Sequence, residues 1–341
     1  MSRAGAPITV MQLLVDPAVG PKSFNPYTTL LVGALDPSLV RTRYFRWKGL
    51  LTDDFDVLHV HWPEHFTRHR YGVVRVMKAV LLLVFLVRIR LQRKAIVRTA
   101  HNLRPHEKGT WIERRVLDCL DRCTTLWFVL NDATPVPAAR KLLIQHGHYR
   151  DWYRMPRPGE QVPGRLLAFG LIRAYKGMDD LVSAFRDVPG DQWTLHLCGR
   201  AESSETVARL EQARAGDQRV RLDLRFVPDE ELAQEIAQSE AVVLPYRDIH
   251  NSGVALLALS LNRPVIVRDA PATRLLEQEF GSEWVHRFTG DLDAQTLTAS
   301  VFALRGSVRA DEADMSGREW SVLAAEMTAG YRRALTLAGQ R

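Results

Sequence analysis

Two cations follow a short apolar segment at the start of the second half of the chain. The sequence there reads LLAFGLIRAYKGMDDLVSAF (166–185), and Arg173 and Lys176 stand between a predicted strand and an amphipathic helix. Such a junction offers free backbone N–H groups and the positive end of a helix dipole, to which the two side chains add charge. This arrangement suits a diphosphate, but a plain strand–helix turn with solvated Arg and Lys explains the position equally well.

A polar loop opens a second helix further along. Within AVVLPYRDIHNSGVALLALSLNRPVIV (241–267) a buried strand ends at Pro245, and Asn251, Ser252 and Gly253 begin an apolar helix. Asn251 or Ser252 can cap that helix, and the amides around Gly253 can bind an anion. Capping alone is the structural alternative, and we expect the cap to form whether or not the helix also binds an anion.

Carboxylates that can act as a base occur in the first half of the chain. Glu64 directly follows the predicted strand 57–61, behind the rigid and apolar Trp62-Pro63 turn. Apolar surroundings raise the pKa of a carboxyl group toward the range that a general base needs. Asp16 holds the equivalent place after the predicted strand 8–15, where helix capping is the simpler explanation.

Histidines are the other candidates in this half. His101 follows the predicted strand 95–100, and Glu107 comes soon after it. His59 and His61 share one strand, and we expect their rings on opposite sides of it, with at least one hydrogen-bonded in the core. His146 and His148 flank Gly147, where a close approach to a ligand and a structural turn are equal alternatives.

Short β-branched segments alternate with longer helical stretches along the whole chain. This rhythm predicts an α/β protein of two doubly wound, parallel-sheet, Rossmann-like domains facing a cleft at the carboxyl ends of their strands. The Pro-rich stretch 155–164 marks the boundary and predicts domains at 1–155 and 156–318, with a last helix at 319–341 packing back across the junction. The predicted strands are 8–15, 40–45, 57–61, 95–100 and 125–130, then 166–171, 193–198, 222–227, 241–245 and 264–268.

Three segments of the second half carry a resemblance to a known family. In order, they are FGLIRAYKGMDDLVSAF, FVPDEELAQEIAQSEAVVLPY and SGVALLALSLNRPVIV. Together they resemble the nucleotide-sugar domain of glycosyltransferases with the GT-B fold, most of all the family 4-like group. The resemblance covers residues 166–268. It implies that Lys176 and Arg173 bind the diphosphate of a nucleotide-sugar donor, and that Ser252 and Gly253 do so through the helix N-terminus. His250 and Asn251, in the same loop, join the donor-binding candidates.

One departure from that family bears on the mechanism. Its retaining members carry two glutamates eight positions apart before the G-x-P-V-I element, and the matching positions here are Ile249 and Leu257. We therefore expect an inverting transfer, in which one base deprotonates the acceptor hydroxyl as it attacks the anomeric carbon. Glu64 is the expected base, with His101 near the donor sugar as the alternative. Arg, Lys and helix dipoles can stabilise the leaving diphosphate. Since no Asp-x-Asp pair ends a predicted strand, no metal or cofactor is expected.

Segments of the first domain carry a second resemblance. These segments are VLHVHWPE (57–64), RTAHNLRPHE (98–107) and IQHGHYRDWY (144–153). They resemble the acceptor domain of inverting bacterial exopolysaccharide glycosyltransferases, closest to the β-mannosyltransferase group of xanthan-type assembly. This implies transfer of a hexose from GDP-mannose or a UDP-sugar to a saccharide or lipid-diphosphate-linked saccharide in cell-surface or exopolysaccharide synthesis. The acceptor-binding candidates are Trp62, Asn102, Glu107 and His148.

The charge balance suits an anionic partner without choosing one. The 341 residues contain 46 Lys and Arg against 39 Asp and Glu, a net charge of +7. Basic residues surround an apolar centre in 68–94, which fits a buried helix with basic ends and a peripheral contact with an anionic membrane equally. The sequence shows no secretory signal and no apolar run long enough to span a bilayer. We expect a cytoplasmic protein, peripheral on the inner face of the plasma membrane if 68–94 binds lipid.

Two other classes of function remain open from the sequence. A nucleotide-sugar epimerase of the two-domain type shares the fold and would act on the donor without an acceptor. A basic nucleic-acid-binding protein would explain the net charge, but the cations are dispersed and no nucleic-acid-binding motif is present. We therefore expect no nucleic-acid partner.

Overall fold

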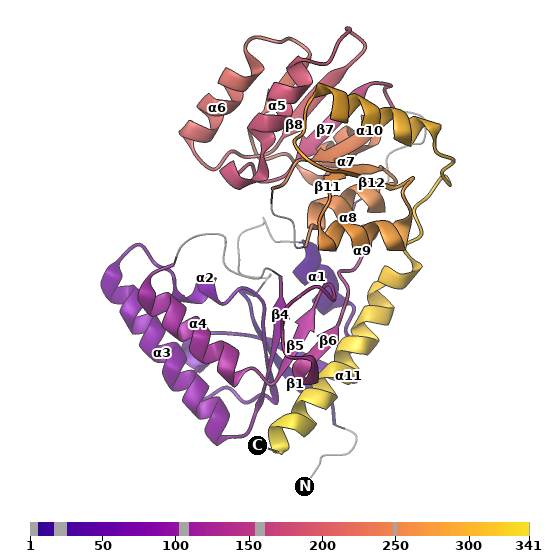
Figure 1. Cartoon of the computed structure of the whole chain (residues 1–341). Helices are drawn as coiled ribbons and strands as arrows, with labels where there is room; N and C mark the ends of the chain where they lie inside the picture. Colours follow the sequence, from indigo (N-terminus) through magenta and orange to yellow (C-terminus); the bar gives the residue numbers. More distant parts are fainter. Residues whose placement is uncertain (1–5, 17–25, 102–108, 154–160, 248–250, 341) are drawn as a thin grey trace. The chain divides into compact units, whose positions relative to one another are not determined.

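The computed structural model describes residues 6–16, 26–101, 109–153, 161–247 and 251–340. The chain divides into two compact units: unit 1 contains Met1–Gly147 with Arg318–Arg341, and unit 2 contains His148–Gly317. Each unit has a six-stranded, all-parallel sheet, as the alternation of strands and helices predicts (Figure 1). The start of the predicted Pro-rich boundary, 155–160, lies outside the described residues.

The sheet of unit 1 has the strand order β2-β1-β3-β4-β5-β6. Its central strands are short and almost wholly buried, which is the usual condition of parallel strands covered by helices on both faces. The strands are β1 (Ile8–Leu13), β2 (Val40–Tyr44), β3 (Val57–Val60), β4 (Ala95–Ala100), β5 (Leu126–Val129) and β6 (Lys141–Leu143).

Each face of this sheet has its own apolar core, because successive side chains of a strand point to opposite faces. On one face, Val57 and Phe128 pack against α1 (Pro26–Gly33) and α11 (Trp320–Gly339). On the other face, Leu58 and Ile96 pack against α3 (Gly72–Leu91) and α4 (Trp111–Cys123). Shorter helical segments are η1 (Trp47–Gly49), α2 (Glu64–Thr67) and η2 (Ala138–Arg140).

The sheet of unit 2 has the strand order β12-β11-β10-β7-β8-β9. The strands are β7 (Arg165–Phe169), β8 (Thr194–Cys198), β9 (Val220–Asp223), β10 (Ala241–Leu244), β11 (Val265–Arg268) and β12 (Val285–Phe288). The helices are η3 (Ala174–Lys176), α5 (Met178–Arg186), α6 (Ser204–Arg214), α7 (Asp229–Gln238), α8 (Gly253–Ser260), α9 (Pro271–Phe280), α10 (Ala294–Gly306) and η4 (Ser316–Arg318). The boundary between the units falls within η4, because Arg318 is the first residue of the segment that returns to unit 1.

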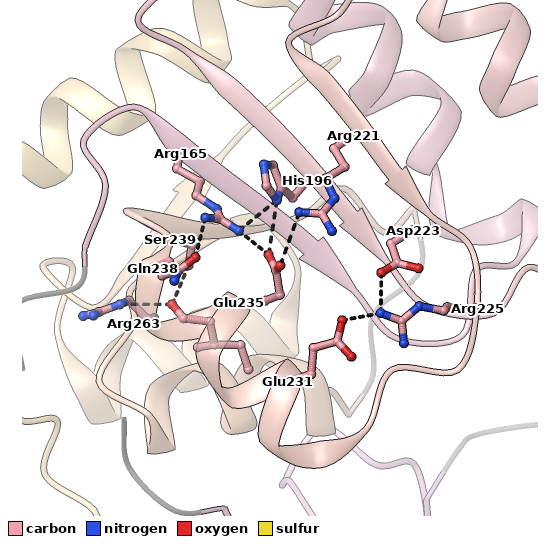
Figure 2. Close-up of polar contacts among 11 residues, drawn as sticks. Arg165, His196, Arg221, Asp223, Arg225, Glu231, Glu235, Gln238, Ser239 and Arg263 are labelled. Carbon is pink, nitrogen blue, oxygen red and sulfur yellow. Dashed lines mark hydrogen bonds and ion pairs between the residues drawn. The ribbon is translucent and has the colours of Figure 1, made fainter. Parts of the chain in front are cut away.

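A polar network ties α7 to strands β7 and β8 (Figure 2). The Glu235 carboxylate lies 2.5 Å from Arg165 Nη2 and 3.2 Å from His196 Nδ1. The hydrogen bond with His196, together with the charge of Arg165, lowers the pKa of Glu235 to about 2 against the opposing effect of burial. Ion pairs of this kind hold the helix in register over the sheet.

The sequence missed two edge strands. β6 has three residues and β12 reads VHRF, so neither offers a run of β-branched or alternating residues long enough to stand out. The predicted strand 222–227 is displaced from β9, which ends at Asp223. The other predicted strands match the observed strands to within about two residues at each end.

Candidate active site

In unit 2, Lys176 is a buried cation without a carboxylate partner among the described residues. It ends η3, is 8% exposed, and its Nζ lies 4.8 Å from the centre of the Tyr246 ring. Burial, together with the charge of Arg173, lowers the pKa of Lys176 to about 8. A desolvated ammonium beside a second cation is a strong binding position for an anion.

The first turn of α8 reaches the same place as the Lys176 ammonium. Gly170 directly follows β7 and has φ +103°, and a Cβ added there would lie 3.6 Å from Lys176 Nζ and 3.4 Å from Val254 Cγ2. The missing side chain therefore leaves open the space between Lys176 and α8. Gly177 has φ +64°, and a Cβ there would lie 2.9 Å from the carbonyl oxygen of Pro245, so this turn requires glycine.

Ser252 caps α8, as the sequence predicts. Its Oγ accepts the backbone N–H of Ala255 at 3.1 Å, which leaves the amides of Gly253 and Val254 at the open end of the helix. Asn251 and Ser252 are half-buried. Arg173 Nε lies 3.7 Å from Glu202 Oε1, too far for a hydrogen bond. His250 lies outside the described residues.

In unit 1, four histidines gather at the carboxyl ends of β3 and β4. The rings of His59 and His61 lie 4.2 Å apart, so the prediction that they face opposite sides was wrong: residues two apart in a strand share a face. His59 is the hydrogen-bonded core histidine, with Nδ1 2.8 Å from Tyr331 Oη and Nε2 2.8 Å from Thr99 Oγ1. Tyr27 packs against His61, His101 and His146.

The hydrogen bonds fix the tautomer of His101. Burial lowers the pKa of His61 to about 3 and that of His146 to about 4, and it holds the pKa of His101 well below its usual range, so the rings are neutral. Gln12 Oε1 can only accept, so His61 carries its proton on Nε2, 3.2 Å away. His61 Nδ1 then accepts the Nε2–H of His101 at 3.1 Å, which places the lone pair of His101 on Nδ1.

Two further candidates lie beside this histidine. The Trp62 indole stacks on the His101 ring, with centroids 4.2 Å apart and planes 19° apart. Glu64 begins α2 and is half-buried, and its carboxylate accepts no cap or other hydrogen bond from the described residues, which argues against a capping role. The surroundings of Glu64 are less apolar than expected, because the guanidinium of Arg98 lies near it. Burial lowers the pKa of Arg98 to about 10, and the negative charge of Glu64 acts to raise that pKa.

The remaining acceptor candidates do not lie in the described part of unit 1. His148 is buried in unit 2, and its Nδ1 accepts the backbone N–H of Arg150 at 3.2 Å. Asn102 and Glu107 lie outside the described residues. At Gly147 an added Cβ would lie 2.4 Å from the Trp320 indole, so the open space there is used by packing within unit 1.

An Asp-x-Asp triplet follows β12, a strand that the sequence did not reveal. Asp293 of this triplet caps α10 by accepting the backbone N–H of Thr296 at 2.7 Å. Asp291 and Asp293 line a cavity of about 620 Å³ together with Asp180, Arg247 and Arg268. Within the described ranges, no group of three or more His, Cys, Asp or Glu side chains is arranged to hold a metal ion.

Sequence reasoning overlooked Tyr246 and Gln12. Tyr246 directly follows β10 and supplies the ring beneath Lys176, and Gln12 in β1 orients His61. The signal for Tyr246 was its place just after a buried strand. Gln12 is a fully buried amide in an apolar strand, which is a position that a polar side chain rarely occupies without a partner.

Comparison with known proteins agrees with this architecture. The family model for group 1 glycosyl transferases matches residues 163–299. The chain is 40% identical over 296 residues, 87% of its own length and 84% of the relative's, to the GDP-mannose:glycolipid 4-β-D-mannosyltransferase of Xanthomonas campestris pv. campestris.

Solved structures show the same fold at low identity. Anabaena HepE, solved with UDP and glucose, is 15% identical with a TM-score of 0.61, and the match covers 98% of both chains. A glycosyltransferase involved in avilamycin A biosynthesis is 15% identical with a TM-score of 0.62, covering 97% of this chain and 98% of the other. These matches confirm the predicted pair of doubly wound domains.

Proposed function

This chain belongs to the group 1 glycosyl transferases, and we propose that it transfers mannose from GDP-mannose to a glycolipid with inversion at the anomeric carbon. The observation that carries the proposal is its identity, over most of its length, with a Xanthomonas enzyme named for that reaction. A β-linked product from a donor whose sugar–phosphate bond is α requires inversion. Family membership also decides for a glycosyltransferase against the epimerase and the nucleic-acid-binding protein.

Unit 2 would hold the leaving group. The Lys176 ammonium, the Arg173 guanidinium and the first amides of α8 bind the diphosphate, and they stabilise the charge that grows on it as the bond to the sugar breaks. The buried position of Lys176 supports this role, since an ammonium out of water gains most from an anion. These groups supply the required charge without a metal or cofactor.

Unit 1 would provide the acceptor side of the reaction. The acceptor oxygen attacks the anomeric carbon, GDP leaves with the bonding electron pair, and the hydroxyl proton passes to the Glu64 carboxylate. The absence of any hydrogen bond to that carboxylate from the described residues supports this assignment. We assign His101 to the vicinity of the donor sugar, as the alternative base, and the Trp62 indole offers a stacking face. Asn102, Glu107 and His148 stay proposed acceptor contacts.

The acceptor's lipid would bring the protein to a membrane surface. No helix in the part of the chain that the structure describes is long and apolar enough to cross a bilayer. We place the protein at the cytoplasmic face of the plasma membrane, held peripherally through residues 68–94, in synthesis of a cell-surface or exported polysaccharide.

The donor assignment can be tested by thermal unfolding with nucleotides. A ligand that binds only the native state stabilises it by about 2.7 kcal/mol at a concentration of 100 Kd. GDP should raise the melting temperature by several degrees at concentrations where UDP does not. A larger shift with UDP than with GDP would contradict the assignment. Incubation with GDP-mannose alone should leave the sugar's configuration unchanged, whereas an epimerase would alter it.

A further inference from the structure

The outward face of α3 is apolar along its whole length. Eight large hydrophobic residues three or four positions apart form this α3 stripe, and the exposed fraction reaches 83% at Val73 and 79% at Leu91. The opposite face of the helix supplies Leu82, Phe85 and Ile89 to the core of unit 1. Members of the stripe are Val73, Val76, Met77, Val80, Leu83, Val84, Val87 and Leu91. A contiguous exposed surface of this kind marks an interaction site.

Positive charge surrounds the α3 stripe. Residues 65–106 contain no Asp or Glu, whereas 68–94 contain eight Lys and Arg, more than the net charge of the whole chain. Four of these cations are tied to the protein: Arg68 pairs with Glu113, Lys94 pairs with Asp54, and Arg88 and Lys78 donate to backbone carbonyl groups. The other four form no ion pair with any described residue: Arg70, Arg75, Arg90 and Arg93.

A cavity of about 390 Å³ lies at the C-terminal end of the stripe. Leu86, Ile89 and Ile96 give it apolar walls, and Arg90 and Arg93 line it as well. Val87 and Leu91 belong both to the stripe and to this cavity, so the two form one continuous surface. An apolar recess beside guanidinium groups fits an acyl chain whose headgroup carries a phosphate.

We propose that the α3 stripe and its cavity are a docking surface for a bilayer containing anionic phospholipid. A helix with one apolar face and cations beside it lies in the interface, with its apolar side chains among the acyl chains and its arginines at the headgroups. A second copy of the chain would instead bring two sets of unpaired arginines together. The inference rests on the proposed action on a glycolipid, and it adds the surface and the lipid chemistry.

Vesicle flotation with three variants tests the docking surface. Val80→Glu combined with Val87→Glu puts two carboxylates on the stripe, and Arg90→Gln combined with Arg93→Gln removes two unpaired cations. Val308→Glu is the matched control, because Val308 is 97% exposed and belongs to unit 2, whereas α3 belongs to unit 1. Vesicles of phosphatidylcholine with about a third phosphatidylglycerol are compared with pure phosphatidylcholine at low salt.

The wild type and Val308→Glu should float with the anionic vesicles and bind pure phosphatidylcholine at least tenfold more weakly. The double glutamate variant should lose at least tenfold in vesicle affinity, and the double glutamine variant about fivefold for each arginine. Equal binding of the glutamate variant and the wild type would overturn the proposal. So would a wild-type dimer in solution that the glutamate variant abolishes.

Calorimetry with GDP separates this inference from the proposed reaction. All three variants should bind GDP like the wild type, since none alters unit 2 near Lys176. Normal vesicle binding by a protein that fails to bind GDP would contradict the proposed reaction and leave the docking surface standing. Loss of vesicle binding only in the variants that also lose GDP binding would mean misfolding, and would overturn the docking role of the stripe.

Discussion

Replacing Lys176 by methionine should make the protein more stable and less able to bind its donor. Methionine keeps the length of the side chain and removes the charge. Lys176 is 8% exposed, and its ammonium lies over the Tyr246 ring with the charge of Arg173 nearby. Without a bound anion, keeping this buried ammonium charged lowers the free energy of unfolding.

The size of that cost follows from the pKa. A fall from 10.5 to about 8 corresponds to about 3 kcal/mol of unfolding free energy at pH 7. The variant loses the contact with the Tyr246 ring, worth about 0.5–2 kcal/mol, so we expect a net stabilisation of about 1–3 kcal/mol. Loss of a hydrogen bond to a charged group should weaken GDP binding by about 1.5–3 kcal/mol, which is roughly 10- to 150-fold.

The pH dependence has a definite sign. Between pH 8 and 10.5 the unfolded chain binds the Lys176 proton more strongly than the native protein, so unfolding free energy from this group rises with pH. GDP affinity should fall over the same range, because the free protein loses the ammonium that the diphosphate needs. The methionine variant should show neither dependence.

Urea unfolding at pH 7 and 9, with GDP calorimetry at both values, tests this reasoning. Lys48→Met is the matched control, since Lys48 is exposed in unit 1 and should change neither quantity. A methionine variant that is less stable than the wild type and binds GDP within twofold of it would refute the reasoning.

Three other substitutions probe the rest of the molecule. Glu64→Gln should lower turnover by about 10²–10⁴ with GDP affinity unchanged; near-full turnover measured by product formation would place the base elsewhere. His59→Phe leaves Tyr331 Oη and Thr99 Oγ1 without their buried partner, so urea unfolding should show a loss of about 2–5 kcal/mol, with GDP binding intact; an unchanged midpoint would refute the role given to His59. Glu235 has a pKa lowered to about 2, so its stabilisation is present above pH 4.5 and is lost as the pH falls toward 2; Glu235→Gln should be less stable at pH 7 and flatter in this window, and a profile like the wild type would count against the network of Figure 2.

Most of the fold could be predicted because its strands are buried on both faces. Segments such as 57–60 and 241–244 are wholly apolar or nearly so, and helices such as α5 and α7 have clear amphipathic spacing. β6 and β12 lie at sheet edges, where a strand needs no such pattern. The same reason hid the Asp291–Asp293 triplet, whose place after a strand is visible only once β12 is known.

The candidate site was predictable in its donor half and less so in its acceptor half. Lys176 and Ser252 lie within short local motifs, and local chain geometry brings them to their positions. The contact of His61 with His101 and the presence of Arg98 near Glu64 depend on which strands are neighbours and how their side chains turn. These contacts could not be predicted from the sequence, because the order of the strands in the sheet was not known.

The most direct test of the proposed reaction is the configuration of its product. Purified protein is incubated with GDP-mannose and a glycolipid acceptor, with and without EDTA, and the new linkage is analysed by NMR. We predict a β-mannosyl product formed at the same rate in both. An α-linked product, or transfer that stops in EDTA and returns with Mn²⁺ or Mg²⁺, would contradict the metal-independent inverting mechanism.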